Sequence, residues 1–278
     1  MRLDDLTFQD YVALYEQAVS SIDELCSELD AGDWDKPTDC PGWSVKDHLS
    51  HVASYESFAT GRAPKATADI SHLSHLKPGD AVAEANEREI EARRARTPEA
   101  ILSEFRDAAG ARLKHLTSLS GDAVDTDISA WPWGESPTKN MMPIRVLDLY
   151  YHEQDMRRAA GRPGHMRGDV ARYSFERMAK IALPRVFVKL AEAPEGSTIV
   201  WDVPEPGRLF AIASRDGRGD AVDAPADPTV RFTSDLETFL CLFGGRVSPS
   251  RAQDEGRLKV AGDRALAQKI LDNITVVP

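Results

Sequence analysis

The chain has 278 residues, of which 42% are hydrophobic and 28% are charged, and its formal net charge is −11. This composition is typical of a globular protein. The negative charge argues against general attraction to nucleic acid or to an anionic membrane, because both bind clustered Lys and Arg. No uncharged apolar run reaches the roughly 18–20 residues that a membrane span requires. Acidic residues stand where a signal peptide would place its apolar segment, so a cytoplasmic protein is expected.

The chain contains three cysteines, Cys26, Cys40 and Cys241, which are widely spaced and form no C-x-x-C pair. An odd number of scattered cysteines is typical of reduced thiols and not of a disulfide framework. We interpret each of them as a small buried side chain and not as a catalytic nucleophile.

Two long helices are predicted near the start of the chain, over residues 7–32 and 44–62. Each begins with a capping signal, T-x-x-D in the first helix and S-x-x-D in the second, before apolar residues at helical spacing. On the second helix, His48 and His51 lie on one stripe beside an apolar stripe. An imidazole is therefore expected near a surface that packs against other helices.

Further helices follow after a polar loop predicted over residues 63–79. Residues 80–96 are expected to form a charged helix, and a long helix begins at Thr97 with a proline in its first turn. The predicted connection over residues 120–142 contains the run W-P-W-G at residues 131–134. Its tryptophans either wall a substrate pocket or anchor the loop.

The last helix of this region contains R-V-L-D-L-Y-Y-H-E-Q-D-M-R-R over residues 145–158. Asp148, His152 and Asp155 lie four and three residues apart, so all three side chains share one helix face. The helix is expected to begin near Pro143 and to end at Gly161. Four principal helices within residues 1–165 predict an antiparallel bundle.

The pattern changes after residue 165, and residues 166–278 are predicted to form a second, smaller α+β domain. A helical segment over residues 167–193 is interrupted at Pro184, and strands over 197–203 and 208–214 flank the turn P-E-P-G. The remaining predicted elements are strands at 229–233 and 257–260, and helices at 235–243 and 265–274.

His51, Asp148 and His152 are the candidate metal ligands, because one helix supplies an imidazole and another supplies an acid and an imidazole. Helices of a bundle can direct such groups at one central site. Three nitrogen and oxygen ligands with one open position describe a catalytic zinc site, whereas a structural site normally has four ligands and cysteines. His48 competes with His51 for its place in this set.

Three motifs resemble the mycothiol-dependent maleylpyruvate isomerase family. They are C-P-G-W-S-V at residues 40–45 followed by His51, D-L-Y-Y-H-E-Q-D-M-R-R at 148–158, and G-G-R followed by G-R-L-K-V-A-G-D near the end of the chain. The resemblance covers nearly the whole chain. It implies an N-terminal DinB-like four-helix bundle that carries a divalent metal, usually zinc, and a C-terminal domain similar to sterol carrier proteins.

The resemblance also implies a role for particular residues. His51, Asp148 and His152 match the metal ligands of the family, which usually has Glu in place of Asp148. Asp155 matches the functional acid, which orients the thiol cofactor or acts as an acid–base group. An arginine of the C-terminal domain is expected at the site, and we assign this role to Arg246, with Arg257 as the second choice. His48 is not a ligand in this pattern.

The implied function is that of an enzyme in which a metal-bound thiolate attacks a small electrophilic substrate. Mycothiol supplies the sulfur, and an arginine holds a substrate carboxylate. Addition followed by elimination isomerises a cis double bond, as in maleylpyruvate, whereas addition without elimination makes the enzyme a thiol S-transferase. The contrasting hypothesis is a non-catalytic ligand-binding or sensing bundle whose inward polar groups form a hydrogen-bonded network without metal.

Overall fold

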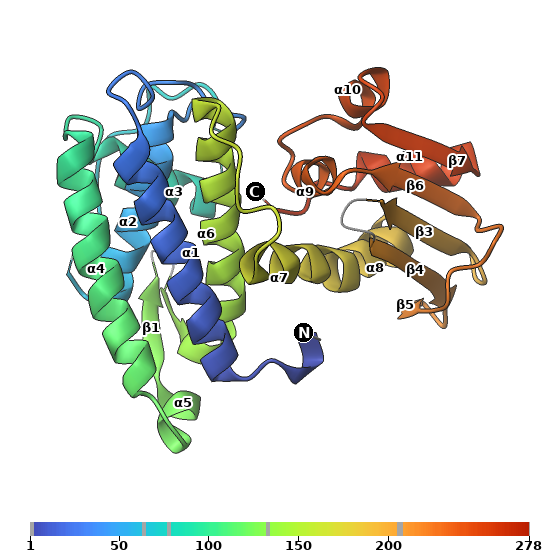
Figure 1. Cartoon of the computed structure of the whole chain (residues 1–278), viewed down its shortest axis with the longest axis horizontal. Coiled ribbons are helices and arrows are strands. Elements are labelled where there is room, and N and C mark those ends of the chain that lie inside the picture. Colours follow the sequence, from blue (N-terminus) through green and yellow to red (C-terminus); the bar gives the residue numbers. More distant parts are fainter. Residues whose placement is uncertain (1–2, 63–64, 77–78, 132–133, 205–207, 278) are drawn as a thin grey trace. The chain divides into compact units, whose positions relative to one another are not determined.

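A computed structural model describes residues 3–62, 65–76, 79–131, 134–204 and 208–277 (Figure 1). The chain divides into two compact units, Met1–His165 and Met166–Pro278. Each unit contains its own hydrophobic core, so each is described separately. Among the described residues, no helix combines the length and the apolar character that crossing a bilayer requires.

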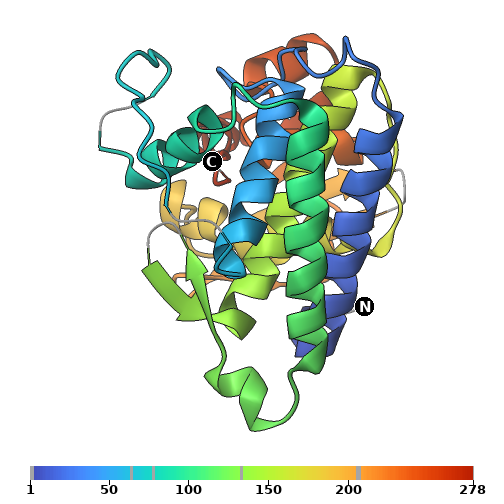
Figure 2. The ribbon, with the colours of Figure 1, turned by 90° about the vertical axis from the view of Figure 1, so that its left-hand side faces the viewer.

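The first unit is built on four helices that run side by side (Figure 1; Figure 2), which confirms the predicted bundle. They are α1 (Phe8–Glu28), α2 (Val45–Ala59), α4 (Pro98–Ser118) and α6 (Thr138–Ala160). Helices α1 and α2 each pack against both α4 and α6. A shorter helix, α3 (Ala81–Glu91), packs against α2. Fully buried apolar side chains of the four helices include Tyr15, Ile22, Leu49, Val52, Phe105, Val146 and Leu149.

Local capping places the two helices that carry the candidate ligands. Ser44 and Asp47 form a complete capping box, in which each side chain accepts a hydrogen bond from the other residue's backbone N–H. This cap fixes the start of α2. At the end of α6, Gly161 adopts a left-handed conformation with φ of 68°, which is the expected glycine C-cap.

The connection before α6 differs from the predicted loop. It contains a short helix, α5 (Asp122–Thr126), and a hairpin of β1 (Ile128–Trp131) and β2 (Gly134–Pro137). Trp131 is buried in the hairpin, while Trp133 lies outside the described residues. Helix α6 starts at Thr138, before the predicted start at Pro143, so the proline lies inside the helix. Position 143 provides no backbone N–H, but this loss of one intrahelical donor does not break the helix so close to its start.

The second unit has a five-stranded sheet in the order β5–β4–β3–β6–β7. Strand β3 (Thr198–Val203) pairs antiparallel with β4 (Arg208–Arg215) and parallel with β6 (Val230–Ser234). The edge strands are β5 (Arg218–Ala221) and β7 (Leu258–Gly262). The predicted hairpin of β3 and β4 is therefore present, although turn residues 205–207 lie outside the described residues. Sequence reasoning missed β5.

Helices of the second unit accompany this sheet and confirm the predicted α+β class (Figure 1). They include α7 (Asp169–Arg177), α9 (Leu236–Phe243), α10 (Pro249–Asp254) and α11 (Arg264–Asp272). The interruption predicted at Pro184 takes the form of two π-helical turns, Met178–Ala182 and Val186–Leu190, on either side of α8 (Leu183–Arg185). Wider turns accommodate the proline without ending the helical path. Helix α10 was not predicted.

Candidate metal centre

His51, Asp148 and His152 lie together in the first unit. Helix α2 carries His51, and the adjacent helix α6 carries the other two residues one turn apart. One donor atom from each of the three residues lies within 4.8 Å of the others. Asp148 Oδ1 is 3.6 Å from His51 Nε2 and 3.3 Å from His152 Nε2. The structure therefore brings the three candidate ligands to one point.

The donor set fits a divalent cation. Ligands about 2.1 Å from a tetrahedral zinc ion are about 3.4 Å from each other, which is close to the two distances between the histidines and Asp148. The His51 side chain is 2% exposed, and neither of its ring nitrogens forms a hydrogen bond with any described residue. A buried polar atom without a partner costs free energy. A metal ion at this point would provide a partner for Nε2, the ring nitrogen that faces Asp148.

The local electrostatics favour the ionisation states that a metal requires at His51 and Asp148, whereas they favour the protonated ring at His152. Burial lowers the pKa of His51 to about 4, assisted by the charge of His152, so the ring is neutral at physiological pH. Burial opposes ionisation of Asp148, but His152 and Arg145 outweigh it and hold the pKa of the carboxyl well below its usual range. Burial also opposes a charged His152, yet Asp148 and Asp155 raise its pKa. Asp148 is thus an anion beside a neutral imidazole of His51.

A buried network of charges holds Asp148 in place. Arg145 donates from Nη1 to Asp148 Oδ2 and from Nε to Glu56 Oε1 at 2.8 Å. Glu56 is completely buried and also accepts from Tyr15 at 2.6 Å and from Arg112 at 3.1 Å. Sequence reasoning missed this network. Its only signal is a glutamate within the otherwise uncharged run V-A-S-Y-E-S-F-A of α2.

The turn before α2 places Trp43 against the histidines. The centroid of its ring lies 5.1 Å from those of His48 and His51 and 5.6 Å from that of His152. Gly42 makes this turn possible because its φ of 81° is one that residues with a side chain rarely adopt, and a Cβ atom there would also lie 2.5 Å from the ring of His75. The C-P-G-W motif therefore positions an aromatic cover over the candidate ligands.

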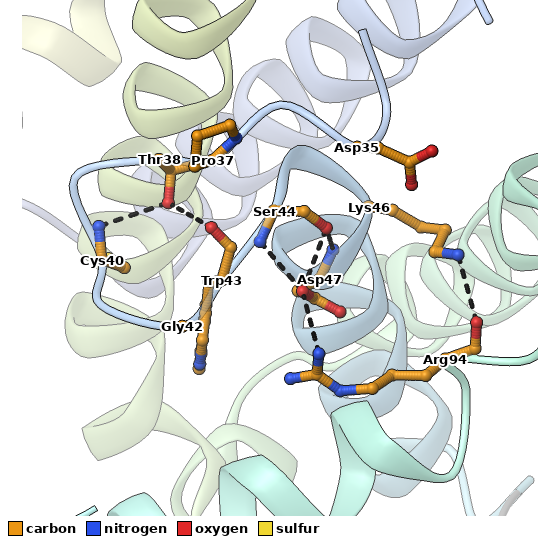
Figure 3. Close-up of a pocket in the computed structure, with 10 residues that line it drawn as sticks. All are labelled: Asp35, Pro37, Thr38, Cys40, Gly42, Trp43, Ser44, Lys46, Asp47 and Arg94. Carbon is orange, nitrogen blue, oxygen red and sulfur yellow. Dashed lines mark hydrogen bonds and ion pairs between the residues drawn. The ribbon is translucent and has the colours of Figure 1, made fainter. Parts of the chain in front are cut away.

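A pocket of about 480 Å³ opens beside this cover (Figure 3). Trp43 belongs both to the pocket wall and to the ring cluster of the candidate centre, and Cys40 is a half-buried part of the wall. Basic and acidic groups meet at the pocket, where Lys46 Nζ donates to the carbonyl oxygen of Arg94 and Arg94 Nη1 lies 3.7 Å from Asp47 Oδ2. The complete lining is Asp35, Pro37, Thr38, Cys40, Gly42, Trp43, Ser44, Lys46, Asp47 and Arg94. Its volume is sufficient for a small molecule.

Asp155 and His48 lie on the far side of His152 from Asp148. Asp155 is completely buried, accepts from Arg158 Nη2, and accepts from the Cys40 thiol with an Sγ to Oδ2 distance of 3.5 Å. His48 Nδ1 lies 2.9 Å from His152 Nδ1. Cys40, His48 and Asp155 form a second group of possible metal ligands. His48 thus lies next to Nδ1 of His152, on the opposite side of that ring from Asp148, and does not join Asp148 and His152 as His51 does.

The two arginines considered from the sequence belong to the second unit. Arg246 is 8% exposed and donates to the backbone carbonyl of Gly244. Arg257 forms an ion pair with Glu255, with an Nη2 to Oε2 distance of 2.6 Å. Both arginines thus have partners within the second unit. A role of Arg246 or Arg257 toward a substrate stays a prediction.

Comparisons with known proteins identify both parts of the chain. Residues 15–157 match the model of the mycothiol maleylpyruvate isomerase N-terminal domain, and residues 189–272 match the SCP-2 sterol transfer family. The crystal structure of mycothiol-dependent maleylpyruvate isomerase has a TM-score of 0.58 and 16% identity over 94% of this chain and 95% of that chain. A mutant of that isomerase has a TM-score of 0.57 and 15% identity over the same shares. No curated protein sequence matches the chain.

Proposed function

Because the chain belongs to the mycothiol-dependent maleylpyruvate isomerase family, we propose that it is a metal-dependent enzyme that uses mycothiol to act on a small electrophile. The metal is zinc, and the reaction is a cis–trans isomerisation of a maleylpyruvate-like carboxylate or a thiol S-transfer. The convergence of His51, Asp148 and His152 carries this proposal. Two imidazoles, one carboxylate and an open position are the donor set of a catalytic zinc site.

Each residue of the centre has a defined task in this proposal. His51 holds the metal through a ring that is already neutral, His152 releases a proton when it binds, and Asp148 holds the metal as an anion that Arg145 orients. A bound zinc ion supplies the positive charge that keeps a coordinated thiol ionised at neutral pH. Trp43 packs against the histidine rings and forms a wall of the adjacent pocket, which is the proposed place of a small substrate although none of the three ligands lines it.

Two further roles are carried over from the family pattern. Asp155 orients the thiol cofactor or transfers a proton, and Arg246 holds a carboxylate of the substrate. The burial of Asp155 beneath Cys40 and Arg158 favours an orienting role over direct contact with a substrate. The cytoplasmic location expected from the sequence fits an enzyme that uses a reduced thiol.

A non-catalytic bundle with a hydrogen-bonded polar core is the alternative, and His51 argues against it. Such a core is stable only when its members are satisfied by one another. Both ring nitrogens of His51 have no hydrogen-bond partner among the described residues, although the side chain is buried. Nε2 lies 3.6 Å from Asp148 Oδ1, too far for a good hydrogen bond and close to the spacing of two ligands of one zinc ion, so a metal explains this nitrogen better than a ligand-free network does.

Metal analysis of the purified full-length protein tests the centre. We expect one equivalent of zinc in the wild type and a strong loss in His51→Ala and His152→Ala. His115→Ala is a matched control, because this histidine is largely exposed and pairs with Asp127 away from the proposed ligands. Equal metal content in the wild type, His51→Ala and His152→Ala would exclude the proposed ligand set.

Product analysis tests the reaction. The zinc-loaded protein is incubated with mycothiol and either maleylpyruvate or a panel of electrophiles, and products are identified by mass spectrometry. Fumarylpyruvate without net consumption of thiol supports the isomerase, and stable conjugates support the S-transferase. If neither forms at a rate above that of the His51→Ala protein, the enzymatic proposal is wrong.

A further inference from the structure

His152 uses its two ring nitrogens in different directions. Its Nε2 atom faces Asp148 Oδ1 at 3.3 Å and belongs to the candidate centre, whereas its Nδ1 atom faces His48 and Asp155. A nitrogen that binds a metal carries no hydrogen, so a neutral His152 that binds through Nε2 must carry its hydrogen on Nδ1. The group that accepts this hydrogen therefore fixes the tautomer in which His152 can bind the metal.

The distances select His48 as the acceptor. His48 Nδ1 lies 2.9 Å from His152 Nδ1, within hydrogen-bond range, while Asp155 Oδ2 lies 3.7 Å away. The usual partner of a metal-bound histidine is a carboxylate, a backbone carbonyl or a water molecule. Here Asp155 is engaged instead by Arg158 on Oδ1 and by the Cys40 thiol on Oδ2. The imidazole of His48, and not the carboxylate of Asp155, is therefore the acceptor for Nδ1 of His152.

Thr38 completes the arrangement on the other side of His48. If His48 accepts through Nδ1, its own hydrogen is on Nε2, and Thr38 Oγ1 lies 2.8 Å from that atom. The Thr38 hydroxyl can in turn donate to the carbonyl oxygen of Trp43 at 3.0 Å. Each donor in the chain then has an acceptor, and the chain ends at a backbone carbonyl that can only accept.

We propose that His48 is a positioning residue of the metal centre, because it accepts the Nδ1 hydrogen of His152 and so leaves Nε2 of His152 available to the metal. Thr38 holds His48 in the tautomer that this task requires. The inference rests on the proposed metal-dependent function, and neither His48 nor Thr38 belongs to the proposed ligand set. Loss of such a supporting partner typically weakens metal binding about 10- to 100-fold.

Zinc affinity of the full-length protein, measured by competition with a chromophoric chelator, tests this role. His48→Leu removes both ring nitrogens, and Thr38→Val replaces the hydroxyl by a methyl group of similar size. We expect both variants to bind zinc about 10- to 100-fold more weakly than the wild type. Thr38→Ser, which keeps the hydroxyl, should restore nearly wild-type affinity. This rescue shows that the hydroxyl and not the methyl group is required; because the hydroxyl also bonds the backbone of Cys40 and Trp43, the tautomer of His48 provides the separate test of its role.

Imidazole nitrogen NMR of the zinc-loaded protein, labelled with ¹⁵N-histidine, provides a second measurement that does not depend on activity. His48 should carry its hydrogen on Nε2 and His152 on Nδ1. His48 with its hydrogen on Nδ1, or wild-type affinity in folded His48→Leu and Thr38→Val, would overturn the proposal. If His51→Ala abolishes zinc binding while these two variants retain it, only the role of His48 fails. If the wild type itself binds no zinc, the proposed function fails as well.

Discussion

Arg145 and Asp148 form an ion pair across one turn of α6, and this pair directs the free oxygen of the carboxylate at the two histidines. Arg145 Nη1 binds Asp148 Oδ2, which leaves Oδ1 facing His51 Nε2 and His152 Nε2. Arg145 is itself fixed to α2, because its Nε donates to Glu56 and its Nη2 donates to the carbonyl of Val52 at 2.9 Å. The geometry of the candidate centre thus depends on contacts between two helices.

Replacing Arg145 should weaken both the fold and the centre. Arg145→Met leaves the buried carboxylate of Glu56 with one cation fewer, and removal of one partner of a buried ion pair typically costs about 3–5 kcal/mol. Zinc affinity should fall as well, because Asp148 loses the group that orients it. Denaturant unfolding and chelator competition measure the two effects.

A matched control for Arg145 is Arg106→Met on α4. Arg106 pairs with Asp23 at the surface, where its side chain is 49% exposed, and such pairs contribute roughly 0–1 kcal/mol. We expect little change in stability or in zinc affinity for this control. Similar losses in both variants would mean that the buried pair has no special role.

Asp148→Asn separates the charge of this residue from its shape. The amide has nearly the same size but lacks the negative charge, so zinc affinity should fall by at least about tenfold. Stability should fall less than in Arg145→Met, because Glu56 still neutralises Arg145. Metal competition and unfolding measure the two quantities. Wild-type zinc affinity in the folded Asn variant would remove Asp148 from the ligand set.

Features fixed by neighbouring residues could be predicted from the sequence. The capping box of Ser44 and Asp47 gives the start of α2, and helical spacing places Asp148 and His152 on one face of α6. Together these local rules specify which side chains point inward. They did not decide between His48 and His51 on the second helix, and the preference for His51 came from the resemblance to the family.

Features that depend on contacts between distant segments could not be predicted. Glu56 and Arg145 are 89 residues apart, and only the packing of α2 against α6 shows that they form a pair. The same applies to His48, which the sequence presents as a competitor of His51. Only the observed positions show that its Nδ1 meets Nδ1 of His152, whereas the open side of His152 faces Asp148. The early start of α6 likewise involves a contact with an earlier segment, because the backbone N–H of Thr138 donates to the carbonyl oxygen of Asp127 at 3.0 Å.

Cys40 should be dispensable for catalysis if mycothiol supplies the sulfur. Its thiol is in the pocket wall and donates to Asp155, but it is not among the proposed ligands. We expect Cys40→Ser to keep its zinc and most of its mycothiol-dependent turnover, because the serine hydroxyl can still donate to Asp155. Turnover without mycothiol should be absent in both proteins. Loss of all turnover in a folded, zinc-loaded Cys40→Ser protein would instead assign the nucleophile to the chain.

Glu104 should stabilise the first unit at neutral pH, and this stabilisation should be lost at acidic pH. Its carboxylate accepts from Arg93 at 2.7 Å, from Ser57 at 2.7 Å and from Arg96. Burial alone would raise the pKa of Glu104, but these partners outweigh it and lower the pKa from 4.5 to about 2. The stabilisation is therefore complete above pH 4.5 and is lost as the pH falls toward 2.

Glu104→Gln tests this linkage through the difference in unfolding free energy between the wild type and the variant. At pH 5–7 the variant should be less stable by about 2–3 kcal/mol, and the difference should shrink steadily below pH 4.5. The sign follows from the lowered pKa, since the unfolded chain takes up a proton at a higher pH than the folded protein. Asp107→Asn, an exposed position on the same helix, is the control and should show no such trend. A difference that stays constant between pH 6 and pH 3 would show that Glu104 stabilises the fold by packing and not by its charge.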